Sequence, residues 1–105
     1  MVTLQFQDVA ARDEFLALVQ PVIRHVTKHE RTTLGYEVLL SDKDELQVLF
    51  LERYLDKEVA YLQIHKSSAA FLEFRPKLQA MQQAGRVTVS GNSFVDSGMG
   101  FVGRN

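Results

Sequence analysis

An α+β fold, with one antiparallel sheet and helices on one of its faces, is predicted by three features of the sequence. The chain opens with strict alternation of apolar and polar residues over Val2–Gln7, which is the period of a half-buried strand. A helical apolar stripe from Phe15 to Val26 follows. Two apolar runs, Tyr36–Leu40 and Leu46–Tyr54, then flank a charged, turn-prone insert and predict a hairpin. The order strand, helix, strand, strand, helices, strand matches a ferredoxin-like sheet.

The boundaries of the first helix follow from capping chemistry. Asp8 is expected to begin it, because its side-chain oxygen can accept a hydrogen bond from a free backbone N–H of the first turn. The helix should end between Lys28 and Glu30, where the apolar rhythm stops. Pro21 lies inside it and is expected to kink it near Gln20, since proline removes a backbone donor.

The third predicted strand is apolar on both faces. One face carries its even-numbered residues, Leu46, Val48, Phe50, Glu52 and Tyr54. The opposite face carries Leu49 and Leu51. We therefore expect the helices to cover one face and a second copy of the chain to cover the other. A chain of 105 residues has room for one domain, residues 1–105, and gains core by pairing.

Two helices are predicted after the third strand. Asp56 is expected to cap a short one that runs to about His65. Ser67 or Ser68 should cap the next, and Gly85 should end it.

The C-terminal segment is predicted to return to the sheet. Arg86–Asp96 has the pattern of a fourth strand, and Met99–Arg104 of a fifth strand or a continuation. Glycines at 91, 98, 100 and 103 interrupt this segment and indicate bends or bulges.

Composition narrows the functional classes. The formal net charge is -1, which argues against an electrostatic grip on nucleic acid or on an anionic membrane. Cysteine is absent, which excludes disulfides, thiolate metal ligands and cysteine nucleophiles. The first residues show neither the basic flank nor the apolar run of a signal peptide, so we expect a cytoplasmic protein. No glycine-rich phosphate loop or nucleophile elbow is present, and no cofactor is expected.

Three histidines are candidates for chemistry. His25 and His29 are four residues apart on the first helix, where they suit the negative end of the helix dipole, and capping is the preferred interpretation. A metal site there would need a further carboxylate, such as Glu30 from a dimer mate. His65 lies between apolar Ile64 and the phenylalanines that follow, so it could act as an acid, a base or a hydrogen-bond donor in a pocket, or simply join two helices.

Two further polar residues are candidates for the same pocket. Glu52 shares a strand face with Phe50 and Tyr54, and it either orients a base or forms a buried pair with Arg75, Lys77 or His65. The hydroxyl of Tyr36 could point into a cavity, although a core tyrosine is equally compatible with the pattern.

One segment resembles the antibiotic biosynthesis monooxygenase family. Members often show Glu-x-Trp at the end of a strand and then His-x-x-Ser-x-His-Phe-x-x-Phe. The matching positions here are Glu52, His65, Ser68, Phe71 and Phe74, with Tyr36 matching a tyrosine upstream. Tyr54 replaces the tryptophan and Ala70 the second histidine.

The resemblance implies a dimeric α+β barrel in which C-terminal strands reach across to the partner. It also implies one of several activities: cofactor-free oxygenation of quinols or anthrones, haem degradation, or isomerisation of small phosphorylated sugars. The chain has no tryptophan, and the positions used by the haem-degrading branch hold Gln5 or Gln7, His65 and Arg75, which disfavours haem degradation.

The leading hypothesis is a cofactor-independent monooxygenase acting on a small aromatic, quinol-like substrate in a pocket between sheet and helices. In it His65 handles a proton, while Tyr36 and Glu52 orient the substrate. The substrate would lie against aromatic side chains, Phe50, Tyr54, Phe71 and Phe74. The alternatives are an isomerase of a small polar or phosphorylated ketone, and a non-catalytic small-molecule-binding dimer.

Overall fold

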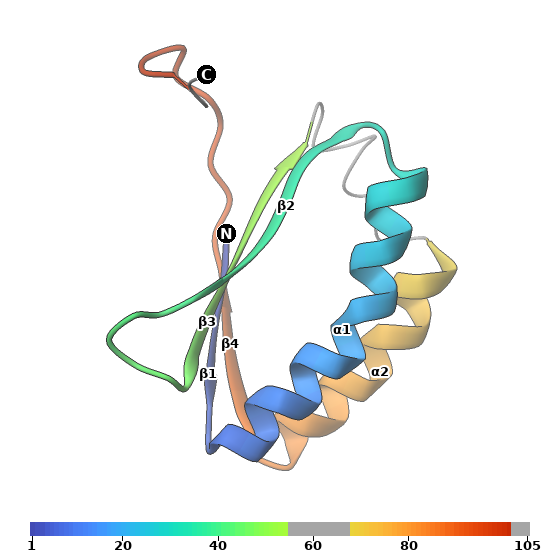
Figure 1. Cartoon of the computed structure of the whole chain (residues 1–105), viewed down its shortest axis with the longest axis vertical. Coiled ribbons are helices and arrows are strands. Elements are labelled where there is room, and N and C mark those ends of the chain that lie inside the picture. Colours follow the sequence, from blue (N-terminus) through green and yellow to red (C-terminus); the bar gives the residue numbers. More distant parts are fainter. Residues whose placement is uncertain (55–67, 102–105) are drawn as a thin grey trace.

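The computed structural model describes residues 1–54 and 68–101. Four antiparallel strands form one sheet in the order β2-β3-β1-β4. They are β1 (Val2–Phe6), β2 (Thr33–Leu40), β3 (Gln47–Tyr54) and β4 (Val87–Gly91). Two helices, α1 (Val9–His29) and α2 (Ala69–Gln83), lie side by side on one face of the sheet (Figure 1). The predicted α+β, ferredoxin-like fold is confirmed.

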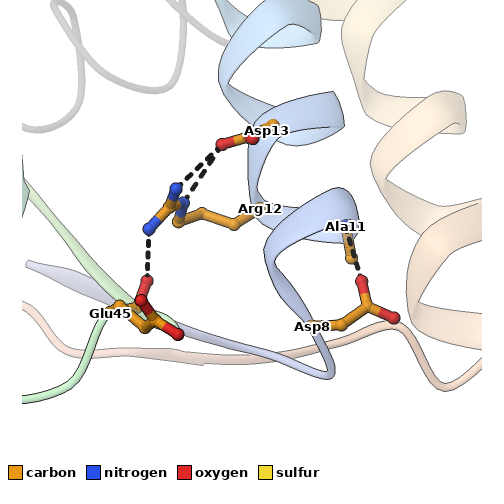
Figure 2. A network of polar contacts seen from close by, with 5 residues as sticks. All are labelled: Asp8, Ala11, Arg12, Asp13 and Glu45. Atoms are coloured by element: carbon orange, nitrogen blue, oxygen red, sulfur yellow. Dashed lines mark hydrogen bonds and ion pairs between the residues drawn. The ribbon is translucent and has the colours of Figure 1, made fainter.

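Side-chain caps set the start of both helices. The Ala11 backbone N–H donates to Asp8 Oδ1 at 2.8 Å, as expected for the cap of α1 (Figure 2). Ser68 is the cap of α2, accepting from the Phe71 N–H at 3.2 Å. Both helices continue through an internal proline, Pro21 in α1 and Pro76 in α2. Neither helix is long and apolar enough to cross a membrane, nor is any other helix in the described part of the chain.

Arg12 ties the first turn of α1 to the β2–β3 hairpin. Its guanidinium donates to Asp13 Oδ1 at 3.0 and 3.2 Å and to the Glu45 carbonyl oxygen at 2.8 Å (Figure 2). One donor of this planar group therefore links two elements that are far apart in sequence, while two others bind the neighbouring Asp13 and hold the guanidinium in place. This contact fixes the hairpin against the base of the helix, at the opposite end of α1 from His29.

The core lies between the sheet and the two helices. Leu4 and Val48 face it from the strands, and Val19 and Val22 from α1, all with at most 1% of their surface exposed. Phe15 is central, because its ring centroid lies 5.4 Å from that of Phe6, 5.6 Å from Phe50 and 5.8 Å from Phe74. The periodicities predicted for β1 and α1 therefore point into a single core.

The second strand begins earlier than predicted. β2 starts at Thr33 rather than Tyr36, and Thr33 pairs with Tyr54 at the end of β3. A register shift between Thr33 and Gly35 lets the ladder continue across an irregularity. The prediction missed this extension because the backbone pairing, and not apolar alternation, holds these residues in the sheet.

The fourth strand ends earlier than predicted. β4 stops at Gly91, which pairs with Val2, the first residue of its neighbour β1. Beyond that point β1 offers no further residues, and Asn92 closes the ladder by exchanging two 2.8 Å hydrogen bonds with Met1. The prediction of a strand to Asp96 was therefore wrong, and residues 99–101 of the predicted fifth strand belong to no strand. Residues 102–104 of that strand lie outside the described residues.

Residues 92–101, here called the C-terminal arm, leave the body of the protein (Figure 1). Its large apolar side chains are strongly exposed, from 69% at Phe94 to 93% at Val95. The sheet face opposite the helices carries the half-buried Leu49 and Leu51 and the exposed Leu39. Both faces of β3 are therefore apolar, as the sequence predicted, and the two described helices cover one of them.

Candidate functional site

A cavity of about 330 Å³ lies between the sheet and α2. Its volume falls in the range that small-molecule sites occupy. Four phenylalanines form much of its wall, Phe15 from α1, Phe50 from β3, and Phe71 and Phe74 from α2. Phe50 and Phe74 are also buried members of the core, so these rings serve packing and the cavity wall together.

The strand side of the cavity carries two polar residues. Tyr36 of β2 and Glu52 of β3 both line it, and they lie directly opposite each other in the β2–β3 ladder. The Tyr36 ring packs edge-on against Phe50 at a centroid distance of 5.9 Å. The backbone pairing therefore holds a phenol and a carboxylate side by side at the edge of an aromatic wall.

Tyr54 supports Glu52 from the next position on the same face of β3. Its hydroxyl donates to Glu52 Oε1 at 2.9 Å, and both side chains are half-buried. Tyr54 itself is not among the residues that line the cavity. A hydrogen bond to an ionised carboxylate is stronger than one between neutral groups, so it can fix the rotamer of Glu52.

Of the partners predicted for Glu52, Arg75 and Lys77 do not pair with it, and His65 lies outside the described residues. Lys77 instead approaches Glu73, with Nζ 3.7 Å from Oε1, one turn away on α2. Arg75 lines the cavity but forms no ion pair with Glu52. The shared strand face of Glu52 and Tyr54 was the available signal, because residues i and i+2 of a strand point the same way.

A row of polar side chains lines the cavity from α2, and the sequence analysis had considered only its first member, Arg75. Arg75, Gln79 and Gln82 line the cavity together with Leu78. Their spacing of four and three residues places them on one helix face. The apolar periodicity of α2 had been followed at Phe71, Phe74 and Leu78, whereas the interleaved Gln79 and Gln82 had been missed.

His65 lies outside the described residues. The other two histidines lie at the end of α1, with ring centroids 5.2 Å apart. His25 Nε2 approaches Oε2 of the buried Glu30 of the same chain at 3.1 Å, so this carboxylate does not have to come from a dimer mate. Within residues 1–54 and 68–101, no three histidine or acidic side chains are arranged to hold a metal ion.

Comparisons with known proteins agree with this fold and indicate a family. A model of the family described as antibiotic biosynthesis monooxygenase matches residues 3–77. Among solved structures, an antibiotic biosynthesis monooxygenase is similar with 23% identity and a TM-score of 0.62, over 90% of this chain and 96% of that one.

Two further solved structures share the fold at lower identity. A conserved protein of unknown function from Bacteroides thetaiotaomicron, named a possible oxidoreductase, has 16% identity and a TM-score of 0.67, over 85% of each chain. A conserved protein from Methanosarcina mazei has 19% identity and a TM-score of 0.63, over 88% of this chain and 89% of that one. No curated protein matches the chain in sequence.

Proposed function

The chain belongs to the antibiotic biosynthesis monooxygenase family, and on this premise we propose a cofactor-independent monooxygenase that acts on a small aromatic, quinol-like molecule. The supporting observation is the cavity itself, which combines an aromatic wall with the Tyr36 and Glu52 side chains. The volume suits one substituted ring. Phenylalanine faces and edges would pack against that ring.

In the proposed reaction the electron-rich substrate supplies all the electrons. Loss of a proton gives a carbanion or phenolate that passes an electron to O₂, and the two radicals then combine. The attacked ring carbon of the quinol exchanges its C–H bond for a bond to oxygen and the ring ends as a hydroxyquinone, while the second oxygen atom leaves as water with two of the substrate's hydrogens. Glu52 would orient a substrate hydroxyl by accepting its hydrogen bond, and Tyr36 would donate to a developing oxyanion.

His65 is proposed as the group that takes the proton, on the strength of its match to the family motif. Oxygen consumption with a panel of quinols tests both statements. We expect turnover by the wild-type protein and at least about a hundredfold loss in His65→Ala. Thermal unfolding of both proteins serves as the folding control. The proposal fails when no quinol in the panel supports oxygen uptake, and the role of His65 fails when the variant keeps full activity.

Arg75 favours a second candidate, an isomerase of a small polar or phosphorylated ketone. That reaction would need a cation at the cavity, and Arg75 supplies one. Proton exchange with solvent at the carbon next to a ketone, without oxygen uptake, would identify this activity.

We further propose a homodimer whose uncovered sheet faces pack against each other, with exchange of the C-terminal arms. Leu39 and Leu49 are cross-strand partners on that face, and Leu51 lies next along β3. The arm exposes Phe94, Val95, Met99 and Phe101, which a partner sheet could bury. Large apolar patches on a small protein are typical of interaction surfaces.

Leu49→Glu should therefore dissociate the dimer, because it would bury an unpaired carboxylate in the interface. We expect the dimer dissociation constant from sedimentation velocity to rise at least about a hundredfold. Leu72→Glu is the matched control, since Leu72 lies 55% exposed on α2, away from the sheet. A monomeric wild-type protein, or an intact Leu49→Glu dimer, would refute this assembly.

A further inference from the structure

The polar row on α2 has no function in the reaction proposed above. Arg75, Gln79 and Gln82 line the cavity from the helix side, opposite the strand that carries Glu52. The nearby Lys77 is held by Glu73, and Arg86 by Glu14. Arg75 alone of these cations has no carboxylate within ion-pair distance in the part of the chain that the structure describes.

We infer that this row binds an acidic substituent of the substrate, so that the substrate class is an aromatic hydroxy acid. The inference rests on the proposed function for the ring, but the recognition of its substituent is separate. A guanidinium presents a planar fork of donors that matches a carboxylate bidentately. The amides of Gln79 and Gln82 are able to donate to the same group.

The polar groups of the cavity then divide the ligand into three parts. Glu52 is an acceptor for a hydroxyl at the strand side, and its negative charge disfavours a carboxylate there. The phenylalanines enclose the ring. Arg75 neutralises the acid at the helix side, which orients the ring in one sense only. A cavity lined by phenylalanine alone would not distinguish the two ends of the ligand.

A carboxylate is preferred over a phosphate because Arg75 is the single cation lining the cavity within the described residues. A phosphate dianion would leave a second negative charge without compensation. Its three terminal oxygens would also bring more negative charge into a cavity that already holds Glu52.

Isothermal titration with 2,5-dihydroxybenzoate and its methyl ester tests the inference without requiring turnover. We expect the wild-type protein to bind the acid at least about tenfold more tightly than the ester, since charge-assisted hydrogen bonds are lost in the ester. Arg75→Gln should abolish this preference by weakening binding of the acid much more than binding of the ester. Raising the salt concentration should weaken binding of the acid only, because the guanidinium is exposed.

Lys77→Gln is the matched control, because it removes a cation of the same helix that does not line the cavity. It should keep the preference for the acid, and thermal unfolding should show both variants folded. Equal affinity for acid and ester, equal loss of both in Arg75→Gln, or tighter binding of 4-hydroxyphenyl phosphate would overturn the inference. Binding of the acid without any oxygen uptake would instead overturn the monooxygenase and leave the inference standing.

Discussion

Phe15→Ala should lower the free energy of unfolding by about 3–5 kcal/mol, a large part of the stability of a domain this size. The side chain is 1% exposed, and its ring contacts Phe6 of β1, Phe50 of β3 and Phe74 of α2. Truncation therefore removes contacts to three elements at once. Because the space left behind adjoins the existing cavity, we expect the neighbouring rings not to fill it.

Urea unfolding followed by circular dichroism measures this loss, at one fixed protein concentration because dimerisation adds to apparent stability. Phe15→Leu keeps part of the apolar volume and should give an intermediate value. Leu72→Ala truncates an exposed side chain and should stay within about 0.5 kcal/mol of wild type. A loss below about 1 kcal/mol in Phe15→Ala would contradict the central place of this ring.

Local signals made β1 and α1 predictable from the sequence. The alternation of Val2–Gln7 and the Asp8 cap each involve neighbouring residues, so they are visible without a partner element. The end of β4 is different in kind. It coincides with the first residue of β1, Val2, which pairs with Gly91 some ninety positions away, and no local pattern reveals that pairing.

In the candidate site, too, local features could be predicted from the sequence and contacts between elements could not. The face shared by Phe50, Glu52 and Tyr54 is fixed by the two-residue period of a strand and was predicted correctly. The hydrogen bond from Tyr54 to Glu52 was not predicted, because Tyr54, Arg75, Lys77 and His65 all had the chemistry to pair with this carboxyl. Only the relative placement of β3 and α2 decides among them, and periodicity within each element carries no information about that placement.

Glu52→Gln should reduce kcat for quinol oxidation by about a hundredfold or more. The amide keeps the size of the side chain and its carbonyl oxygen still accepts from the Tyr54 hydroxyl, so the geometry of β3 survives. What is lost is the negative charge, which strengthens the hydrogen bond from one substrate hydroxyl as the ring, deprotonated at its other hydroxyl, passes an electron to O₂. The effect should fall on kcat more than on KM, because this interaction grows in the transition state.

Tyr54→Phe separates orientation from charge, since it leaves the Glu52 carboxyl in place and removes only the donor 2.9 Å away. We expect a smaller loss, about tenfold in kcat/KM, and little further loss when Tyr54→Phe is added to Glu52→Gln. Glu37→Gln is the control for charge alone, because Glu37 is exposed on β2 next to Tyr36 and faces away from the cavity. Equal losses in Glu37→Gln and Glu52→Gln would show a general electrostatic effect, whereas additive losses in the double variant would show that Tyr54 does not act through Glu52.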